Sequence, residues 1–181
     1  MRKLKAQIMD EAAINRCMTR IAHEIVEKNK GCENLVIVGI KRRGIPLAKK
    51  ICNNIEKIEG VKVPFCEVDV NLYRDDLEKP ADSLKGKGLN LPFCVADKTV
   101  ILVDDVLYTG RTVRAAIEAI FMAGRPHAIQ LAILIDRGHR QLPIRADYIG
   151  KNIPTSHQER VGVCIAPYDQ TSGVYIFGEE Q

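Results

Sequence analysis

Two adjacent carboxylates stand at the end of an apolar run and lead directly into a loop of glycine and hydroxyl residues. Residues 100–112 read VILVDDVLYTGRT, and a helical pattern follows at once. The start of a helix presents backbone N–H groups and the positive end of its dipole, so this segment suits a phosphate dianion. Gly110 allows the backbone to approach such a ligand closely. Asp104 and Asp105 can accept hydrogen bonds from vicinal hydroxyls or support a magnesium ion indirectly, so the segment predicts a site for a ribose 5-phosphate.

Other interpretations of this segment have to be weighed. An apolar strand that ends in two aspartates also occurs in Walker B strands, but the chain lacks GxxxxGK[ST], which argues against a P-loop nucleotidase. A receiver domain would place its acidic pair near the start of the chain and a phosphate-accepting aspartate one strand later, a role for which Asp136 can be mistaken. Residues 109–112 taken alone could equally be only a helix cap. The full segment 100–112 argues against this interpretation.

A cluster of three cations beside a glycine follows a second apolar run. Lys41, Arg42, Arg43 and Gly44 come directly after residues 35–40, so they are expected at the end of a strand. Three cations at such a place favour an anion-binding site. The alternative is an ordinary solvated basic turn.

Further basic residues lie in two distant segments. The segment 137–151 is too basic and irregular to belong to a core. With the polar face of the first helix it predicts a positive surface suited to phosphates and unpaired RNA bases, although a solvated helix face is the simpler alternative. That polar face, opposite the apolar stripe of the helix, carries Arg16, Thr19, Arg20, His23 and Glu27.

Strands and helices that alternate along the chain must position these groups. Such alternation predicts an α/β domain with a parallel sheet, whose ligands bind beyond the carboxyl ends of the strands. Those ends are residues 41–44, 104–105 and 136–138, where the polar chemistry gathers. Apolar periodicity predicts helices over residues 10–30, 46–58 and 112–123. Apolar runs predict strands over residues 35–40, 61–72, 99–103, 128–135, 161–165 and 174–177.

Length and composition set the class of protein. The length of 181 residues is typical of one domain. The composition, with 46% hydrophobic and 28% charged residues, excludes collagen-like, low-complexity and wholly disordered chains. The net charge of +4 is too small to identify a partner. The six cysteines form no CxxC pair, and no segment has the apolar length of a signal or membrane-spanning helix. We therefore expect a reduced, cytoplasmic protein that does not bind membranes.

The segment 100–112 resembles the motif that binds phosphoribosyl pyrophosphate (PRPP) in the type I phosphoribosyltransferases. Residues 72–77 and 136–155 are similar to a bifunctional branch of that family, which transfers phosphoribosyl to uracil and attenuates transcription of pyrimidine operons. The resemblance runs from about residue 10 to residue 155 and implies an α/β fold: a central, mainly parallel sheet flanked by helices, with a small hood and a flexible loop. The whole chain is then expected to be one such domain, with the flexible loop in 73–97 and the hood, base pocket and RNA-facing segment in 136–160.

The resemblance implies a reaction of uracil with PRPP that gives UMP and pyrophosphate, with Mg²⁺ carried by PRPP. Asp104 and Asp105 would contact the ribose hydroxyls and support the metal, and Arg74 in the flexible loop would meet pyrophosphate. Uracil would lie by the loop after the fourth strand, near Asp136, Arg137 and Ile144. Pyrophosphate would be received by Lys41, Arg42, Arg43 and Gly44. The 5-phosphate would be held by Val106, Leu107, Tyr108, Thr109, Gly110, Arg111 and Thr112.

The resemblance also implies RNA binding. The partner would be a stem-loop in the leader of pyrimidine-operon mRNA, with UMP or UTP favouring binding, PRPP opposing it, and a homodimer or homohexamer as the assembly. Two alternatives stay open: a regulator that keeps the nucleotide pocket only as a sensor, and a phosphoribosyltransferase for another base without an RNA function. Arg42 stands where many relatives carry an uncharged residue, and residues 161–181 fit the usual ending poorly, so we assign them no function. The RNA-binding residues would be Thr19, Arg20, His23, Arg140, Arg145 and Lys151.

Overall fold

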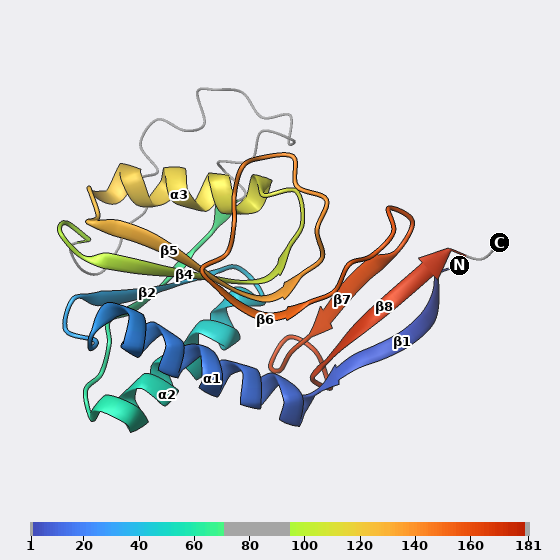
Figure 1. The fold of residues 1–181 in the computed structure, drawn as a ribbon, viewed down its shortest axis with the longest axis horizontal. Coiled ribbons are helices and arrows are strands. Elements are labelled where there is room, and N and C mark those ends of the chain that lie inside the picture. Colours follow the sequence, from blue (N-terminus) through green and yellow to red (C-terminus); the bar gives the residue numbers. More distant parts are fainter. Residues whose placement is uncertain (1, 71–94, 180–181) are drawn as a thin grey trace.

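The computed structural model describes residues 2–70 and 95–179 and contains two sheets (Figure 1). Five parallel strands form the main sheet in the order β3-β2-β4-β5-β6, and three antiparallel strands form a second sheet in the order β1-β8-β7. The described elements are β1 (Arg2–Asp10), α1 (Glu11–Asn29), β2 (Leu35–Ile40), α2 (Gly44–Glu59), β3 (Phe65–Val68), β4 (Thr99–Leu107), α3 (Arg111–Ala123), β5 (Ala128–Asp136), β6 (Tyr148–Asn152), β7 (Arg160–Cys164) and β8 (Gly173–Glu179). The predicted α/β fold with a parallel central sheet is confirmed.

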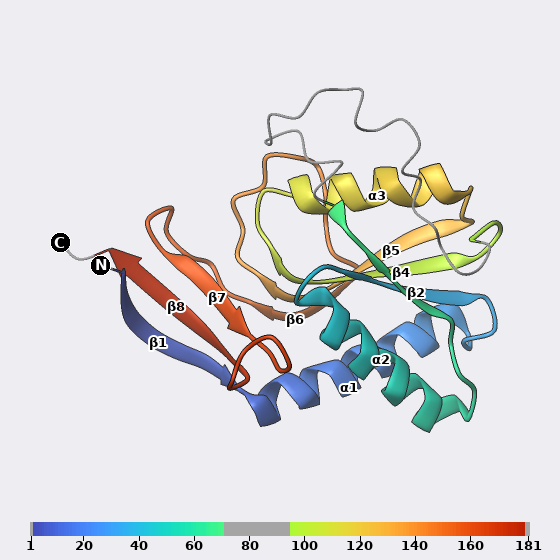
Figure 2. The same ribbon diagram turned by 180° about the vertical axis from the view of Figure 1, so that it is seen from behind.

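The main sheet is covered on both faces, as the continuous apolar runs of its strands require. Helices α1 and α2 pack on one face and α3 on the other (Figures 1 and 2). Along β4, Ile101 and Val103 enter the core under α1 and α2, whereas Val100 and Leu102 enter the core under α3. This alternation buries every residue from 99 to 104 and leaves the carboxyl end of β4 as the place where polar groups can emerge.

Helix α1 is formed by local signals that the sequence displays. Asp10 caps its start by accepting a hydrogen bond from Ala13 N at 2.7 Å, and Lys30 ends it in a left-handed conformation. The stripe of Ile14, Met18, Ile21 and Ile25 is buried against the sheet and α2, as predicted.

The second sheet lies beyond the carboxyl ends of the main-sheet strands, where β7 approaches β4 (Figure 1). Strands β7 and β8 confirm the two predicted C-terminal strands, but β1 was not predicted. The assignment of the hood to residues 136–160 stays a prediction. The second sheet, called the hood sheet below, is built from residues 2–10 and 160–179. Strand β1 escaped prediction because it gains its strand structure from pairing with β8 at the far end of the chain.

Two strand boundaries differ from the predictions, and one further strand was not predicted. The strand predicted over 61–72 is limited to β3 within the described residues, because only 65–68 pair with β2. Strand β4 continues through the two aspartates to Leu107, because β5 pairs with it as far as Asp136. The segment 136–160 was expected to be irregular, yet it contributes β6, which adds an edge strand to the main sheet.

Candidate functional site

The two aspartates lie in the last part of β4. Asp104 is buried and its Oδ1 accepts a hydrogen bond from Asp105 N at 2.9 Å, while Asp105 Oδ1 accepts one from Val106 N at 2.8 Å. Burial raises the pKa of Asp104 well above its ordinary value, and the neighbouring charge of Asp105 raises it further. Burial also raises the pKa of Asp105, which the positive charge of Arg43 opposes. Asp105 borders an open cavity, where a ligand can reach it.

The predicted 5-phosphate loop connects β4 to α3. Residues 106–113 line a cavity of about 330 Å³ in front of the start of α3. Gly110 is the N-cap residue of α3 and has a φ of 94°. As a glycine it makes no side-chain hydrogen bond to the start of the helix. A positive φ of this size strains any other L-residue, which explains the glycine. The loop therefore has the shape and the helix dipole that an anion requires.

The predicted pyrophosphate loop lies beside the two aspartates because Gly44 brings α2 against β4. A Cβ atom at position 44 would overlap Val103 O and lie 3.3 Å from Asp104 Cα, so only glycine permits this approach. The loop, which contains a cis peptide bond between Lys41 and Arg42, leaves those two side chains exposed. The third cation, Arg43, does not point freely into solvent and instead pairs with the C-terminal segment.

That C-terminal segment contributes residues that sequence reasoning missed. Asp169 pairs with Arg43, and a cavity of about 510 Å³ separates Asp105 and Arg43 from residues 160–164 and Phe177 of the hood sheet. The prediction that assigned no function to 161–181 therefore overlooked a wall of the site. No local signal marked it, because 126 positions separate Asp169 from Arg43 in the sequence.

Arg140 connects the predicted 5-phosphate loop to the predicted uracil loop. Its guanidinium donates hydrogen bonds to Leu107 O at 3.4 Å, Tyr108 O at 3.0 Å and Ile144 O at 3.0 Å, and it forms an ion pair with Asp136. The Arg140 side chain is only 22% exposed, so most of its donors are used inside the protein.

Arg137 is buried and also joins loops. It donates hydrogen bonds to Thr155 Oγ1, Ser156 O and Glu159 O, and its guanidinium carbon lies 4.2 Å from the centre of the Tyr108 ring. Asp136 and Arg140 both line a cavity of about 630 Å³. The structure thus brings the predicted uracil residues together with the predicted 5-phosphate loop, although their side chains are largely occupied by each other and by the backbone.

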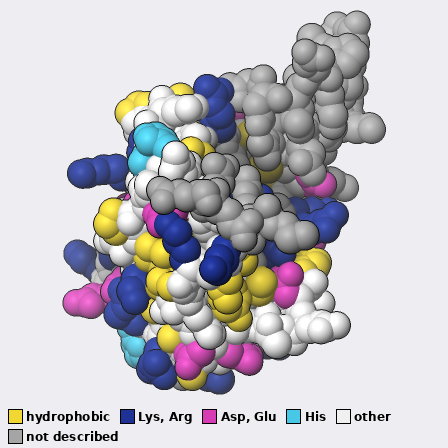
Figure 3. All heavy atoms as spheres, turned by 90° about the vertical axis from the view of Figure 1, so that its right-hand side faces the viewer, with side chains coloured by type: hydrophobic (Ala, Val, Ile, Leu, Met, Phe, Trp, Pro, Cys, Tyr) yellow, Lys and Arg dark blue, Asp and Glu magenta, His cyan; other side chains and the backbone are white. Residues whose placement is uncertain are grey.

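The predicted RNA-binding residues of α1 lie next to β6. Arg20 Nη2 donates hydrogen bonds to Ile149 O at 2.9 Å and Gly150 O at 2.8 Å, which fixes the polar face of α1 along this edge strand. Thr19 and His23 are exposed on the helix, and Lys151 and Arg145 are exposed on and before β6. Figure 3 shows the end of the molecule that carries the hood sheet, where Lys and Arg side chains lie near a central apolar area together with Asp and Glu side chains.

Arg74, predicted to meet pyrophosphate, lies outside the described residues, as do residues 73–94 of the predicted flexible loop. Within residues 2–70 and 95–179 there is no cluster of three His, Cys, Asp or Glu side chains that could hold a metal ion. In the same part of the chain, no helix has the length and apolar character to cross a membrane.

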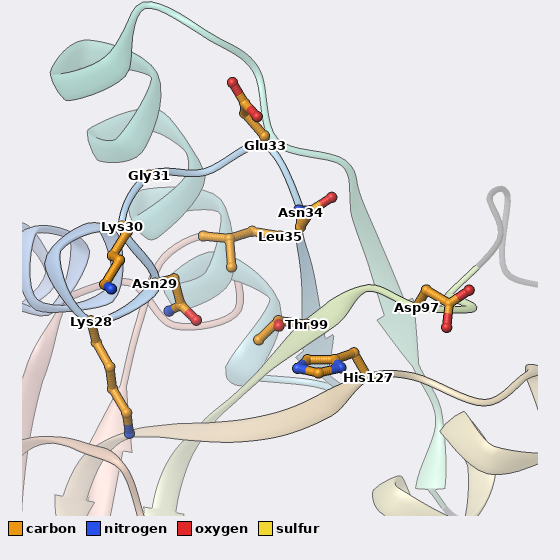
Figure 4. A pocket seen from close by; sticks show the side chains of 10 residues that line it. All are labelled: Lys28, Asn29, Lys30, Gly31, Glu33, Asn34, Leu35, Asp97, Thr99 and His127. Atoms are coloured by element: carbon orange, nitrogen blue, oxygen red, sulfur yellow. The ribbon is translucent and has the colours of Figure 1, made fainter.

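A separate pocket of about 480 Å³ lies at the opposite edge of the main sheet (Figure 4). Thr99 and Leu35, the first residues of β4 and β2, line it together with Asn29. The Asn29 amide donates hydrogen bonds to Gln130 Oε1 at 3.0 Å and Tyr148 Oη at 3.2 Å, so its polar groups serve the packing of α1. We assign no ligand to this pocket.

Comparisons with known proteins agree with this geometry. The phosphoribosyl transferase domain model matches residues 5–167. Solved structures with the same fold include a hypoxanthine phosphoribosyltransferase of Trypanosoma cruzi, with a TM-score of 0.73, 20% identity and 98% of both chains covered. A hypoxanthine-guanine phosphoribosyltransferase of Bacillus anthracis gives a TM-score of 0.71 at 19% identity, covering 96% of this chain and 98% of that one. The fold and the family match are those of a phosphoribosyltransferase.

Much closer relatives narrow the class. The bifunctional protein PyrR of Clostridioides difficile is 60% identical over 172 residues, covering 95% of this chain and 97% of that protein. PyrR of Clostridium kluyveri is 61% identical over 175 residues, and PyrR of Bacillus subtilis is 57% identical over 178 residues, each covering 97% of this chain and 98% of the relative. The chain belongs to the phosphoribosyltransferase family and, within it, to the bifunctional PyrR proteins. The resemblance seen in the sequence is confirmed.

Proposed function

We propose that the chain transfers phosphoribosyl from PRPP to uracil and that it binds pyrimidine-operon leader mRNA under the control of uridine nucleotides. The observation that carries the transferase activity is the placement of Asp105, the loop 106–112 and the loop 41–44 around one edge of the sheet. Membership of the PyrR group supports the pairing of this activity with regulation.

In the proposed reaction, uracil N1 forms a bond to C1 of the ribose while the bond from C1 to the pyrophosphate oxygen breaks. The electron pair leaves with pyrophosphate, and the N1 proton is released to solvent. The loop 106–112 would hold the 5-phosphate, and Asp104 and Asp105 would orient the ribose through its hydroxyls. Positioning of both reactants and neutralisation of the leaving group by Arg43 would supply most of the acceleration.

Magnesium would enter with PRPP. The residues present fit a metal that arrives with its substrate, because Asp105 offers a carboxylate to the cavity. Residues 2–70 and 95–179 contain no cluster of three His, Cys, Asp or Glu side chains that could hold a metal without a substrate. Mg²⁺ prefers to keep several waters and to bind through one or two carboxylates together with substrate phosphates. When bound, it would neutralise negative charge on the departing pyrophosphate.

The RNA-binding surface would consist of Thr19, Arg20 and His23 on α1 with Lys151 on β6 and Arg145 before it. The bonds from Arg20 to Ile149 O and Gly150 O support this proposal, because they join the two segments into one face. Exposed cations on such a face suit phosphates, and the exposed hydroxyl and imidazole suit unpaired bases. Arg140 would act from beneath this face, since its own donors are used internally.

We further infer that residues 1–181 work as one unit and that two or six copies assemble. Cytoplasmic location stays a prediction from the sequence.

Two assays test the proposal. UMP formation from uracil and PRPP with Mg²⁺ should occur with the intact chain and be abolished in Asp105→Ala. Affinity for leader RNA should rise with UMP and fall steeply with salt. UMP formation without UMP-dependent RNA binding would favour a transferase without regulation. RNA binding without UMP formation would favour a sensor that has lost catalysis.

A further inference from the structure

The loop that follows β7 reaches the pyrophosphate loop through a single carboxylate. Asp169 Oδ1 accepts a hydrogen bond from Arg43 Nη2 at 3.0 Å, and Asp169 Oδ2 accepts one from Arg43 Nε at 3.1 Å. This is a two-point ion pair, the arrangement in which a guanidinium loses most of its freedom of orientation.

Asp169 is itself held in place by the backbone. Its Oδ2 atom also accepts a hydrogen bond from Ile165 N at 2.8 Å, and Asp169 N donates to Ile165 O at 3.1 Å. The carboxylate therefore belongs to a closed turn at the edge of the hood sheet. A carboxylate that is fixed in this way can fix its partner in turn.

Arg43 is aimed at the site by this pairing. It lines the same cavity as Asp105, and its side chain keeps 38% of its surface exposed while that of Asp169 keeps 21%. Its remaining Nη1 group has no hydrogen-bond partner among residues 2–70 and 95–179. Arg43 thus presents a charged edge to the cavity while its other edge is anchored.

We propose that Asp169 is a positioning residue that holds Arg43 ready for the pyrophosphate group of PRPP. The proposal rests on the proposed function in one respect, the assignment of residues 41–44 to pyrophosphate. An arginine that is oriented in advance loses less side-chain freedom when an anion binds, so affinity for the anion increases. In this way the C-terminal segment takes part in binding the leaving group.

The test compares Asp169→Asn with the unmodified full chain. Isothermal titration calorimetry with magnesium pyrophosphate should show roughly tenfold weaker binding, because a misaligned cation is a poor partner for the anion. Steady-state assays of UMP formation should show a similar rise in KM for PRPP and a KM for uracil within about twofold. If Asp169 only held the hood sheet in place, its replacement would not raise the KM for PRPP while leaving the KM for uracil nearly unchanged.

Asp147→Asn is a matched control. Asp147 accepts hydrogen bonds from a lysine, Lys28 Nζ at 2.6 Å, and from a backbone amide, Leu131 N at 2.8 Å, so it loses the same two kinds of contact. Its partner Lys28 lines the pocket of Figure 4, away from the cavity that Asp105 and Arg43 line. Its pyrophosphate affinity should equal that of the unmodified chain.

Several outcomes would overturn the proposal. Tighter pyrophosphate binding by Asp169→Asn would mean that Asp169 competes with the ligand, and unchanged binding would mean that it has no role. If Asp169→Asn weakens pyrophosphate binding further in a chain that already carries Arg43→Gln, Asp169 does not act through Arg43. If the unmodified chain makes no UMP, the proposed function fails while the calorimetry still decides the role of Asp169. If that chain does not bind magnesium pyrophosphate, both fail.

Discussion

Replacing Gly44 with alanine tests whether the close approach of α2 to β4 sets the geometry of the site. The added Cβ would overlap Val103 O and lie 3.3 Å from Asp104 Cα. Both atoms belong to the backbone of a central strand that is paired on both sides, so the start of α2 has to move instead. Overpacking of this kind costs about 1–3 kcal/mol in the free energy of unfolding. For a chain of this length, each kcal/mol lowers the melting temperature by about 2–4 °C.

The effect on activity should exceed the effect on stability. The loop 41–43 is carried by the start of α2, so a shift of about 1 Å there misplaces Arg43 and should lower kcat/KM for PRPP roughly 100-fold. The measurement is UMP formation well below the melting temperature, with the folded fraction checked by circular dichroism.

The other end of the same helix supplies the control. Gly60 ends α2 with a φ of 73°, and a Cβ atom there would meet nothing within 4 Å. Gly60→Ala should cost about 1–2 kcal/mol through backbone strain alone and leave kcat/KM for PRPP unchanged. The reasoning is refuted if Gly44→Ala keeps kcat/KM within about threefold of the unmodified chain, or if Gly60→Ala loses as much activity.

Three further predictions concern the carboxylate pair, the RNA face and the first helix. Burial raises the pKa of Asp104 above its value in the unfolded chain, so stability falls as pH rises between the two values. Asp104→Asn should therefore melt higher than the unmodified chain at neutral pH while losing UMP formation, and calorimetry that shows a lower melting temperature there would contradict this. Lys151→Gln should weaken leader-RNA binding about evenly across sequences and reduce the salt slope by about 1, as measured by filter binding, and an unchanged slope would remove Lys151 from the RNA face. Asp10→Ala should lower stability by about 1 kcal/mol through loss of the bond to Ala13 N, and denaturant titration that shows no change would discount this cap.

The parts of the fold that were predictable from the sequence are those whose signals are local. Helix α1 has its cap, its apolar stripe and its stop within residues 10–31. The central strands show continuous apolar runs because both of their faces are covered. The segment predicted to bind the 5-phosphate stands out in the sequence for the same reason, since the aspartates, Gly110 and the start of α3 are adjacent in the chain.

The parts that escaped prediction depend on contacts between distant residues. Strand β1 is largely exposed and pairs with β8, which lies more than 160 positions away. In β6 only Tyr148 is fully buried, so this edge strand lacks the apolar run that marks the central ones. Asp169 joins the site because the C-terminal segment folds back onto Arg43. Neither segment contains a sequence pattern that predicts this contact.

The contacts of Arg140 could not be predicted from its residue type alone. A basic residue in an irregular segment resembles a surface contact for RNA, but its guanidinium bonds to Leu107 O, Tyr108 O, Ile144 O and Asp136. Those bonds connect the loop that would hold the 5-phosphate to the segment that leads into β6 and the proposed RNA face. Linkage between two ligands requires structural states to which both respond, and its effect on their binding is reciprocal. A nucleotide that moves the 5-phosphate loop must move or break the contacts of Arg140, so the proposed control of RNA binding by UMP has a direct physical route through this side chain.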